Sequence, residues 1–172
     1  MTKSRDFVDH LIEQWEIELP GLEYDGLAVF ARLARFTQLA SRRIYQGLEE
    51  FELTESQVNM LAALYRSGAP YRLSPTELST AMLLTPGTIT YVIDQMVDAK
   101  NVVRRSDPTD RRKVIIELTE SGSRRVQSAM RSHVSTCLDL LRALSDPQRR
   151  VFIDSLRMLL LSVDEQGDEI GV

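Results

Sequence analysis

Basic side chains concentrate in one short segment of the 172-residue chain. Between residues 100 and 113 six bases stand against the two acids Asp107 and Asp110, a local charge of +4 in a chain of net charge −4. The six bases are Lys100, Arg104, Arg105, Arg111, Arg112 and Lys113. Because guanidinium and ammonium groups at this density bind phosphate oxygens, the segment predicts a nucleic-acid contact.

Hydroxyl side chains form a second group, a few residues earlier. Ser74 and Thr76 open one helical pattern, and Thr85, Gly87, Thr88 and Thr90 open the next. Projection of residues 86–99 as a helix turns Tyr91 and Gln95 outward and places Ile89, Val92, Ile93, Met96 and Val97 inward. Hydroxyls and unbonded N–H groups at a helix start suit phosphate oxygens and base edges, although an ordinary surface helix with capping threonines has the same pattern.

Five capping signals position these residues on helices. Thr54–Gln57 and Ser74–Glu77 are typical of capping boxes, and Thr85-Pro86, Thr119-Glu120 and Ser145-Asp146 indicate three further helix starts. Two β-branched segments flank an Asp-Pro turn, which predicts a hairpin of strands at 102–105 and 114–118. The predicted helices cover residues 5–18, 25–50, 55–66, 75–82, 86–99, 120–143 and 146–163.

Two short helices joined by about three residues and followed at once by a basic hairpin form a helix-turn-helix with a wing. A wing that carries arginines at its tip suits a DNA minor groove. Asp110 would be repelled by phosphate, so we expect it to hold Arg112 or a cross-strand arginine by a charge-assisted hydrogen bond. The residues expected to contact double-stranded DNA are Ser74, Thr76, Thr85, Gly87, Thr88, Thr90, Tyr91, Gln95, Arg104, Arg105, Asp110, Arg111, Arg112 and Lys113.

Composition limits the classes of protein to which the chain can belong. Hydrophobic residues make up 43% and charged residues 27% of the chain, as in folded globular proteins. The single cysteine, Cys137, excludes an internal disulfide and is expected to pack as a small apolar side chain, with a redox role as the alternative. The absence of a signal sequence and of an apolar run of about 20 residues predicts a cytoplasmic protein without membrane contact. No catalytic, cofactor-binding or metal-ligating pattern is present, so we expect neither an enzyme nor a cofactor nor a metal site.

Two apolar stripes exceed what a solvent-exposed helix needs. One lies on helix 5–18, and the other on the last helix with Val151, Phe152, Leu156, Leu159, Leu160 and Val163. Each stripe could belong to an ordinary core. Together they favour a subunit interface, and we expect a homodimer.

The order of elements resembles the MarR family of bacterial regulators. The resemblance rests on Thr85 to Thr90 (TPGTIT), on the wing segment Asp110-Arg111-Arg112 and on the following ELTESG, and it covers about residues 25–163. It implies a mainly α fold with a β-hairpin wing: a winged helix-turn-helix at 53–119 and interlocking dimerisation helices at 1–52 and 120–172. It also implies a ligand-responsive repressor that binds a pseudo-palindromic operator, with Arg112 as the minor-groove arginine and Asp110 as its partner.

The first helix with Trp15 and the segment Pro70 to Leu78 resemble the urate-responsive subgroup of that family. The ligand set of that subgroup includes an Asp and an Arg where this chain has Asn59 and Val92. An anionic ligand would lose its charge partner, so urate itself is not expected, and a small aromatic or phenolic effector stays open. Trp15 and Asn59 are the candidate ligand residues, with a core position as the alternative for Trp15.

A second function from another class fits part of the sequence. The helix at 86–99 has no Lys or Arg and carries Asp94 and Asp98, which weakens phosphate binding. The alternative is therefore a winged-helix protein-interaction module without DNA binding. Salt dependence separates the two, because phosphate contacts weaken steeply with salt whereas an apolar interface does not.

Overall fold

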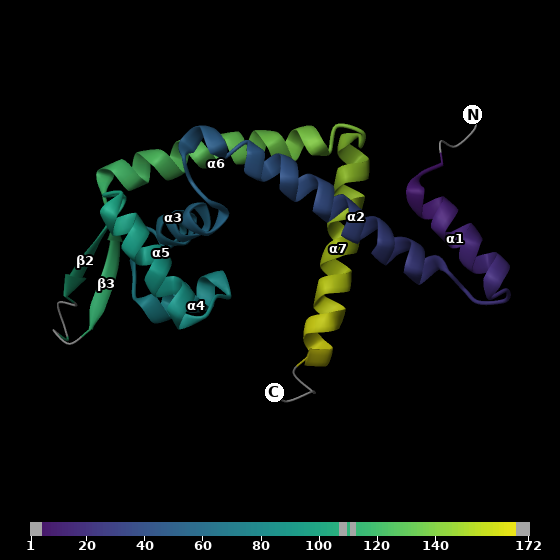
Figure 1. The fold of residues 1–172 in the computed structure, drawn as a ribbon, viewed down its shortest axis with the longest axis horizontal. Coiled ribbons are helices and arrows are strands. Elements are labelled where there is room, and N and C mark those ends of the chain that lie inside the picture. The colour runs from purple at the N-terminus through teal and green to yellow at the C-terminus, as the bar shows by residue number, and fades with distance from the viewer. Residues whose placement is uncertain (1–4, 107–109, 111–112, 168–172) are drawn as a thin grey trace. The chain divides into compact units, whose positions relative to one another are not determined.

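The computed structural model describes residues 5–106, 110 and 113–167, with the side chains described up to residue 163. The chain divides into two compact units, residues 1–133 and 134–172. The first unit contains the helices α1 to α5, a small sheet and most of α6, and the second contains the end of α6 and α7 (Figure 1).

Within the described residues, seven α-helices lie close to their predicted bounds. They are α1 (Phe7–Glu18), α2 (Asp25–Gln46), α3 (Glu55–Arg66), α4 (Pro75–Met82), α5 (Pro86–Asp98), α6 (Glu120–Leu140) and α7 (Asp146–Gly167). The helix predicted at 25–50 was too long. It ends before Gly47, and the chain continues as the short 3₁₀ helix η1 (Glu49–Phe51), because the N–H groups of Leu48 and Phe51 bond three residues back rather than four.

Side-chain caps set the helix starts as predicted. Thr54 accepts from the N–H of Gln57, and the Gln57 side chain bonds back to the Thr54 N–H at 2.9 Å. Ser74 and Glu77 form the same reciprocal pair at the start of α4, and Thr85 caps α5. A further capping box at the start of α1, between Asp6 and Asp9, was missed, since Asp at the third helical position departs from the usual Glu or Gln.

In the part of the chain that the structure describes, the sheet has three antiparallel strands in the order β1-β3-β2. β2 (Val102–Ser106) and β3 (Val114–Leu118) form the predicted hairpin, with Arg105 opposite Ile115. β1 (Arg72–Leu73) pairs its two residues with Glu117 and Ile116 and was not predicted, because two residues are too few to show a strand period.

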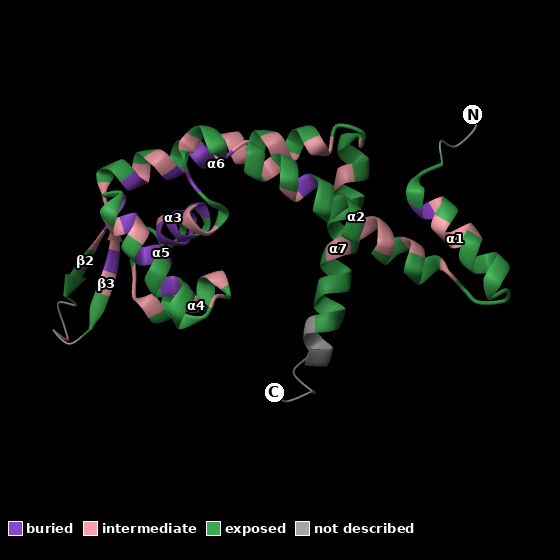
Figure 2. Ribbon diagram, in the orientation of Figure 1, coloured by how far each residue is buried: buried purple, intermediate pink, exposed green. Residues whose placement is uncertain are grey.

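A buried cluster holds the helix-turn-helix together. Its members come from α3, α4, α5 and β3 (Figure 2). Five of them are fully buried: Met60, Leu64, Leu78, Met96 and Ile116. Truncation of such a side chain to alanine costs roughly 2–5 kcal/mol. The core therefore fixes the orientation of α5 about its own axis.

α6 begins in close contact with the turn between α5 and β2. A Cβ atom at Gly122 would lie 2.0 Å from the Asn101 carbonyl oxygen, so only glycine permits this approach. Thr119 adds its hydroxyl, which donates to the carbonyl oxygen of Lys100 at 2.8 Å. Further along α6, the Arg125 Nε donates to the carbonyl oxygen of Phe51 at 3.0 Å. These contacts join the first turns of α6 to the turn between α5 and β2 and to η1.

A tyrosine near the end of α2 interacts with the start of α3. The Tyr45 hydroxyl hydrogen-bonds to Glu55 in the first turn of α3, and this bond, with burial adding to it, raises the pKa of Tyr45 to about 12.

Apolar side chains remain exposed on the other helices. On α1 only Val8 is buried, while Phe7 is 61% and Trp15 45% exposed. On α7 no described residue is buried, and Val151, Met158, Leu160 and Val163 are each more than 60% exposed (Figure 2). Within the described ranges, no helix is both long and apolar enough to cross a membrane.

Candidate nucleic-acid interface

α5 presents one apolar and one polar face, as its sequence predicts. Ile89, Val92, Ile93 and Met96 are buried, and Val97 packs against the same core. Gly87, Thr88 and Tyr91 face solvent, Tyr91 with 64% of its surface exposed. Burial of one face leaves α5 a single way to present the other, so its exposed first turn is positioned by the core.

The hydroxyls at the start of α5 already bond to one another or to the backbone. Thr85 accepts from the N–H of Thr88 at 3.3 Å, and the two hydroxyl oxygens are 2.9 Å apart. Thr90 donates to the carbonyl oxygen of Pro86 at 3.0 Å. All three residues are exposed, and each hydroxyl oxygen can also accept a bond or, after rotation, donate one to a phosphate.

Two outward-facing residues of α5 are engaged by neighbouring elements. Gln95, expected to face outward, is half-buried, and its Oε1 accepts from the Nε2 of Gln57 at 3.2 Å. Asp94 accepts a hydrogen bond from the Arg104 guanidinium on β2. This ion pair neutralises one of the two acids that weakened the prediction of DNA binding. The pair and the Gln57 bond were missed, because sequence spacing does not show which strand or helix residue lies opposite.

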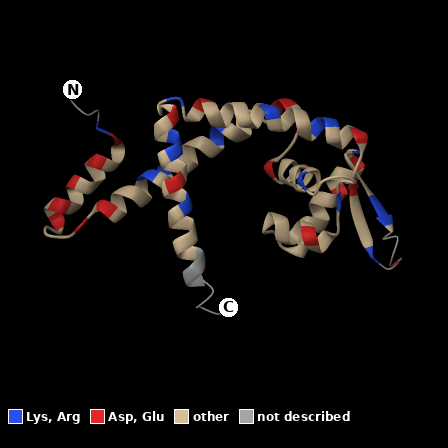
Figure 3. Ribbon diagram, turned by 180° about the vertical axis from the view of Figure 1, so that it is seen from behind, with Lys and Arg blue, Asp and Glu red and all other residues tan. Residues whose placement is uncertain are grey.

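The wing begins where β2 ends at Ser106 and ends where β3 begins at Val114. The Arg105 guanidinium on β2 lies 4.0 Å from the Glu117 carboxylate. Asp110 is half-buried, and its carbonyl oxygen accepts from the N–H of the exposed Lys113 at 2.9 Å. Arg111 and Arg112 lie outside the described residues. Figure 3 shows basic residues on β2 and next to the start of β3, and acidic residues along α1.

The start of α4 lies beside β3. A hollow of about 610 Å³ brings the predicted residues Ser74, Thr76 and Lys113 into one lining, together with Pro75, Glu77, Val114 and Ile115. The Ser74 hydroxyl is committed to the Glu77 carboxylate at 2.7 Å, and the Ser74 N–H and hydroxyl hold the pKa of Glu77 below its ordinary value. Thr76 also lines a smaller hollow of about 140 Å³ with Thr90, so it connects the two helices of the motif.

The two candidate ligand residues lie on different elements. Trp15 is on α1, where its carbonyl oxygen accepts from the Tyr24 hydroxyl at 3.1 Å, and Asn59 is exposed on α3. A hollow of about 580 Å³ between α1 and α2 is lined by neither of them; its lining consists of Arg5, Asp6, Asp9, Ile12, Glu13, Glu16, Ala28 and Arg32.

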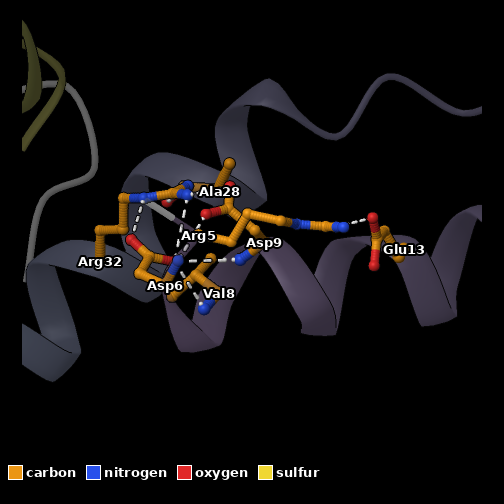
Figure 4. Close-up of polar contacts among 7 residues, drawn as sticks. All are labelled: Arg5, Asp6, Val8, Asp9, Glu13, Ala28 and Arg32. Atoms are coloured by element: carbon orange, nitrogen blue, oxygen red, sulfur yellow. Dashed lines mark hydrogen bonds and ion pairs between the residues drawn. The ribbon is translucent and has the colours of Figure 1, made fainter. Parts of the chain in front are cut away.

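Ion-paired side chains line this hollow. Arg32 of α2 donates to Asp6 at 2.9 Å and to Asp9 at 2.6 Å, and Arg5 pairs with Glu13 (Figure 4). The pKa of Asp6 is lowered, first by the N–H of Asp9 and further by Arg32. Among the described residues, no group of three or more His, Cys, Asp and Glu side chains is placed to hold a metal ion. Cys137 on α6 is half-buried.

Comparison with known proteins gives a consistent result. The MarR family model matches residues 51–113. The HTH-type transcriptional regulator PecS of Dickeya dadantii is 29% identical over 92% of this chain and 93% of the relative. The uncharacterized HTH-type transcriptional regulator YsmB of Bacillus subtilis is 32% identical over 65% of this chain and 75% of the relative. A solved MarR family protein from Bacillus stearothermophilus has a TM-score of 0.70 at 26% identity, covering 84% of this chain and 99% of its own.

A helix-turn-helix with a basic hairpin, in a chain whose relatives are HTH-type regulators, defines a DNA-binding transcriptional regulator with a winged helix-turn-helix. Within that class the chain belongs to the MarR family. The predicted fold class, a mainly α chain with a β-hairpin wing, is confirmed.

Proposed function

We propose that the chain is a homodimeric repressor that binds a pseudo-palindromic operator and is released by a small ligand. The observation that carries this proposal is α5. Its inner face is locked into the core, and its outer face exposes Thr85, Gly87, Thr88 and Tyr91 beside a basic hairpin. A helix held in this way can enter a major groove with its N-terminal turn.

We assign the DNA contacts by element. The first turn of α5 contacts base edges and nearby phosphates, with Thr85, Gly87, Thr88, Thr90 and Tyr91. The α4 start and the hairpin contact the sugar-phosphate backbone through Thr76, Arg105, Arg111 and Lys113. Arg112 enters the minor groove, and Asp110 orients it. Gln95 and Arg104 support α5 in the unbound chain, and Ser74 serves chiefly as the cap of α4.

The dimer uses the exposed apolar faces of α1 and α7. These faces carry Phe7, Trp15, Val151, Met158, Leu160 and Val163, each more than 40% exposed. A second copy of the chain is the partner, because a two-fold dimer carries two recognition helices that match the symmetry of a palindrome. Residues 53–119 then form the DNA-binding domain, and residues 1–52 and 120–172 form the dimerisation region. The half-sites should lie about one helical turn apart.

The effector is proposed to be a small aromatic or phenolic molecule. Trp15 offers a partly exposed ring for stacking, and Asn59 on α3 offers an amide that can donate and accept. The resemblance to the urate-responsive subgroup supports such a ligand class but not urate, which would lack its charge partners at Asn59 and Val92. The ligand would favour a spacing of the two recognition helices that does not fit the operator.

A gel shift tests the proposal. The purified protein and the Arg112→Ala variant are titrated onto duplexes from the upstream region of its own gene, at about 50 and 200 mM salt. We expect a salt-sensitive shift, weakened at least tenfold by the loss of Arg112. Arg131→Ala removes the same charge from an exposed position on α6 and should bind normally. A stable dimer that shifts no duplex at low salt would favour the protein-interaction module instead.

A further inference from the structure

Leu83 is the most solvent-exposed large apolar side chain among the described residues. It follows the last residue of α4 and has 92% of its surface exposed. Its neighbour Leu84 is half-buried and packs against the core. The short connection between α4 and α5 therefore buries one leucine and presents the other to solvent.

The backbone of Leu83 is in the left-handed region, with φ 52° and ψ 40°. The N–H of Leu84 bonds to the carbonyl oxygen of Ser79 at 3.2 Å, and that of Leu83 bonds to Thr80 at 3.4 Å. This is the hydrogen-bond pattern of a Schellman motif, whose left-handed residue is usually glycine because a Cβ atom there crowds the backbone. Leucine at this position is therefore strained.

Leu83 differs from the other left-handed side chains that the structure describes. These are Glu52, Tyr71 and Lys100. Tyr71 stacks on Tyr65 with ring centroids 5.1 Å apart, Glu52 lies 3.6 Å from the Arg125 guanidinium, and Lys100 is an exposed charged residue. Leu83 alone combines a left-handed backbone with an exposed apolar side chain, so neither feature contributes to the stability of the chain itself.

The position of Leu83 indicates what it can contact. It lies two residues before Thr85, the cap of the recognition helix, and α5 is held in place by its buried face. The element that reaches a DNA groove therefore begins next to Leu83. A groove offers an apolar surface there, namely the thymine 5-methyl group and the C–H edges of deoxyribose.

We propose that Leu83 is a DNA-contact residue that buries its side chain against an apolar part of the operator. The inference rests on the proposed operator binding. Leucine makes no hydrogen bond and carries no charge, so its contribution to affinity is independent of salt. If the contact is to a thymine methyl group, Leu83 discriminates thymine from cytosine at one position of each half-site.

The first test is Leu83→Gly, which removes the apolar side chain and relieves the strain of the left-handed backbone. We expect the Tm to rise by about 2–4 °C while operator affinity falls about 3- to 10-fold with an unchanged salt slope. The operator is a duplex selected from a random library by the unchanged protein. Leu83→Asn should give the same loss of affinity, because asparagine also tolerates the left-handed region but has no apolar side chain to bury.

Glu52→Gly is the matched control, because it relieves the backbone of an exposed left-handed residue (φ 51°) that precedes α3. It also removes the ion pair of Glu52 with Arg125, which contributes little because the Glu52 side chain is exposed. Its Tm should also rise. Its affinity should stay equal or increase slightly, since an acid is removed.

A duplex with uracil in place of thymine identifies the contact. Loss of the methyl group should weaken the unchanged protein but not Leu83→Gly if Leu83 contacts a thymine, whereas a deoxyribose contact leaves the two losses additive. Normal affinity of Leu83→Gly with a raised Tm would overturn the inference and leave the proposed function intact. A shift from dimer to monomer in light scattering would also overturn it, because Leu83 would then contact a second copy. If the unchanged protein selects no duplex, the proposed function itself fails.

Discussion

α5 and α7 have similar apolar stripes in sequence but different environments in the structure. On α5 the stripe is buried, with Met96 at 0% exposure, whereas on α7 the equivalent side chains face solvent, with Met158 at 72%. α5 meets α3, α4 and β2 within its own unit. The difference shows that an amphipathic pattern specifies a face to be covered but not the element that covers it.

This contrast distinguishes stability that arises within one chain from stability that depends on a second copy. The helix-turn-helix completes its core within one chain, so its folding should not depend on protein concentration. α1 and α7 leave apolar faces exposed, and burial against a second copy would contribute about 25 cal/mol per Å² of apolar surface. In the proposed dimer, stability of these helices and dimer concentration are therefore linked.

The largest effect on stability is expected when a buried methionine of α5 and an exposed methionine of α7 are each replaced by alanine. Met96→Ala opens a cavity in the core and should lower the free energy of unfolding by about 2–5 kcal/mol in urea titration. Met158→Ala makes the same chemical change at an exposed position and should cost less than about 0.5 kcal/mol in dilute protein. Equal losses in the two variants would mean that α7 packs within the chain as tightly as α5 does.

A smaller effect is expected at the proposed subunit interface. Leu160→Ser on α7 removes apolar area from a side chain that is 65% exposed, so the isolated chain should stay folded while the dimer dissociates more readily. Sedimentation at several concentrations should show the dimer-to-monomer midpoint rising about tenfold. Arg150→Ser alters an exposed polar position on the same helix and should leave that midpoint unchanged. A dimer unaffected by Leu160→Ser would place the interface elsewhere.

Much of the fold could be predicted because its signals are local. Capping residues at Thr54, Ser74 and Thr85 set three helix starts to the residue, and β-branched segments on either side of an Asp-Pro turn identified the hairpin. The prediction failed where the cause is not local. β1 exists because β3 accepts it as a partner, and α2 ends four residues early because the chain turns at Gly47.

The candidate site follows the same rule. The inward and outward faces of α5 were predicted from helical periodicity, and burial confirms them except at Gln95. The contacts Gln57–Gln95 and Asp94–Arg104 join residues 38 and 10 positions apart, and no local pattern indicates them. They change the interpretation of Asp94 from a repulsive acid to the partner of a wing-strand arginine.

The smallest effect concerns how α1 is held on α2. Its described polar contacts include exposed ion pairs from Arg32 to Asp6 and Asp9, which water screens. The Tyr24 hydroxyl also donates to the Trp15 carbonyl oxygen, and the Arg35 guanidinium lies over the Phe7 ring. The pKa of Asp6 in the folded chain is lowered from its ordinary 3.8, first by the Asp9 N–H and then by Arg32. A lowered pKa stabilises the folded state above about pH 3.8, and this contribution is lost as pH falls through the folded value.

Trp15 reports on this helix, because it is the single tryptophan of the chain and lies on α1. As pH falls below about 3.8 we expect a modest change in its fluorescence, because Asp6 becomes protonated and α1 loosens. Asp6→Asn should shift the signal toward its acid value already at pH 5 and flatten the titration, because an amide has no proton to gain. A titration in Asp6→Asn identical to that of the unchanged chain would show that apolar packing around Val8 holds α1 instead, which would make α1 resemble α5 rather than α7.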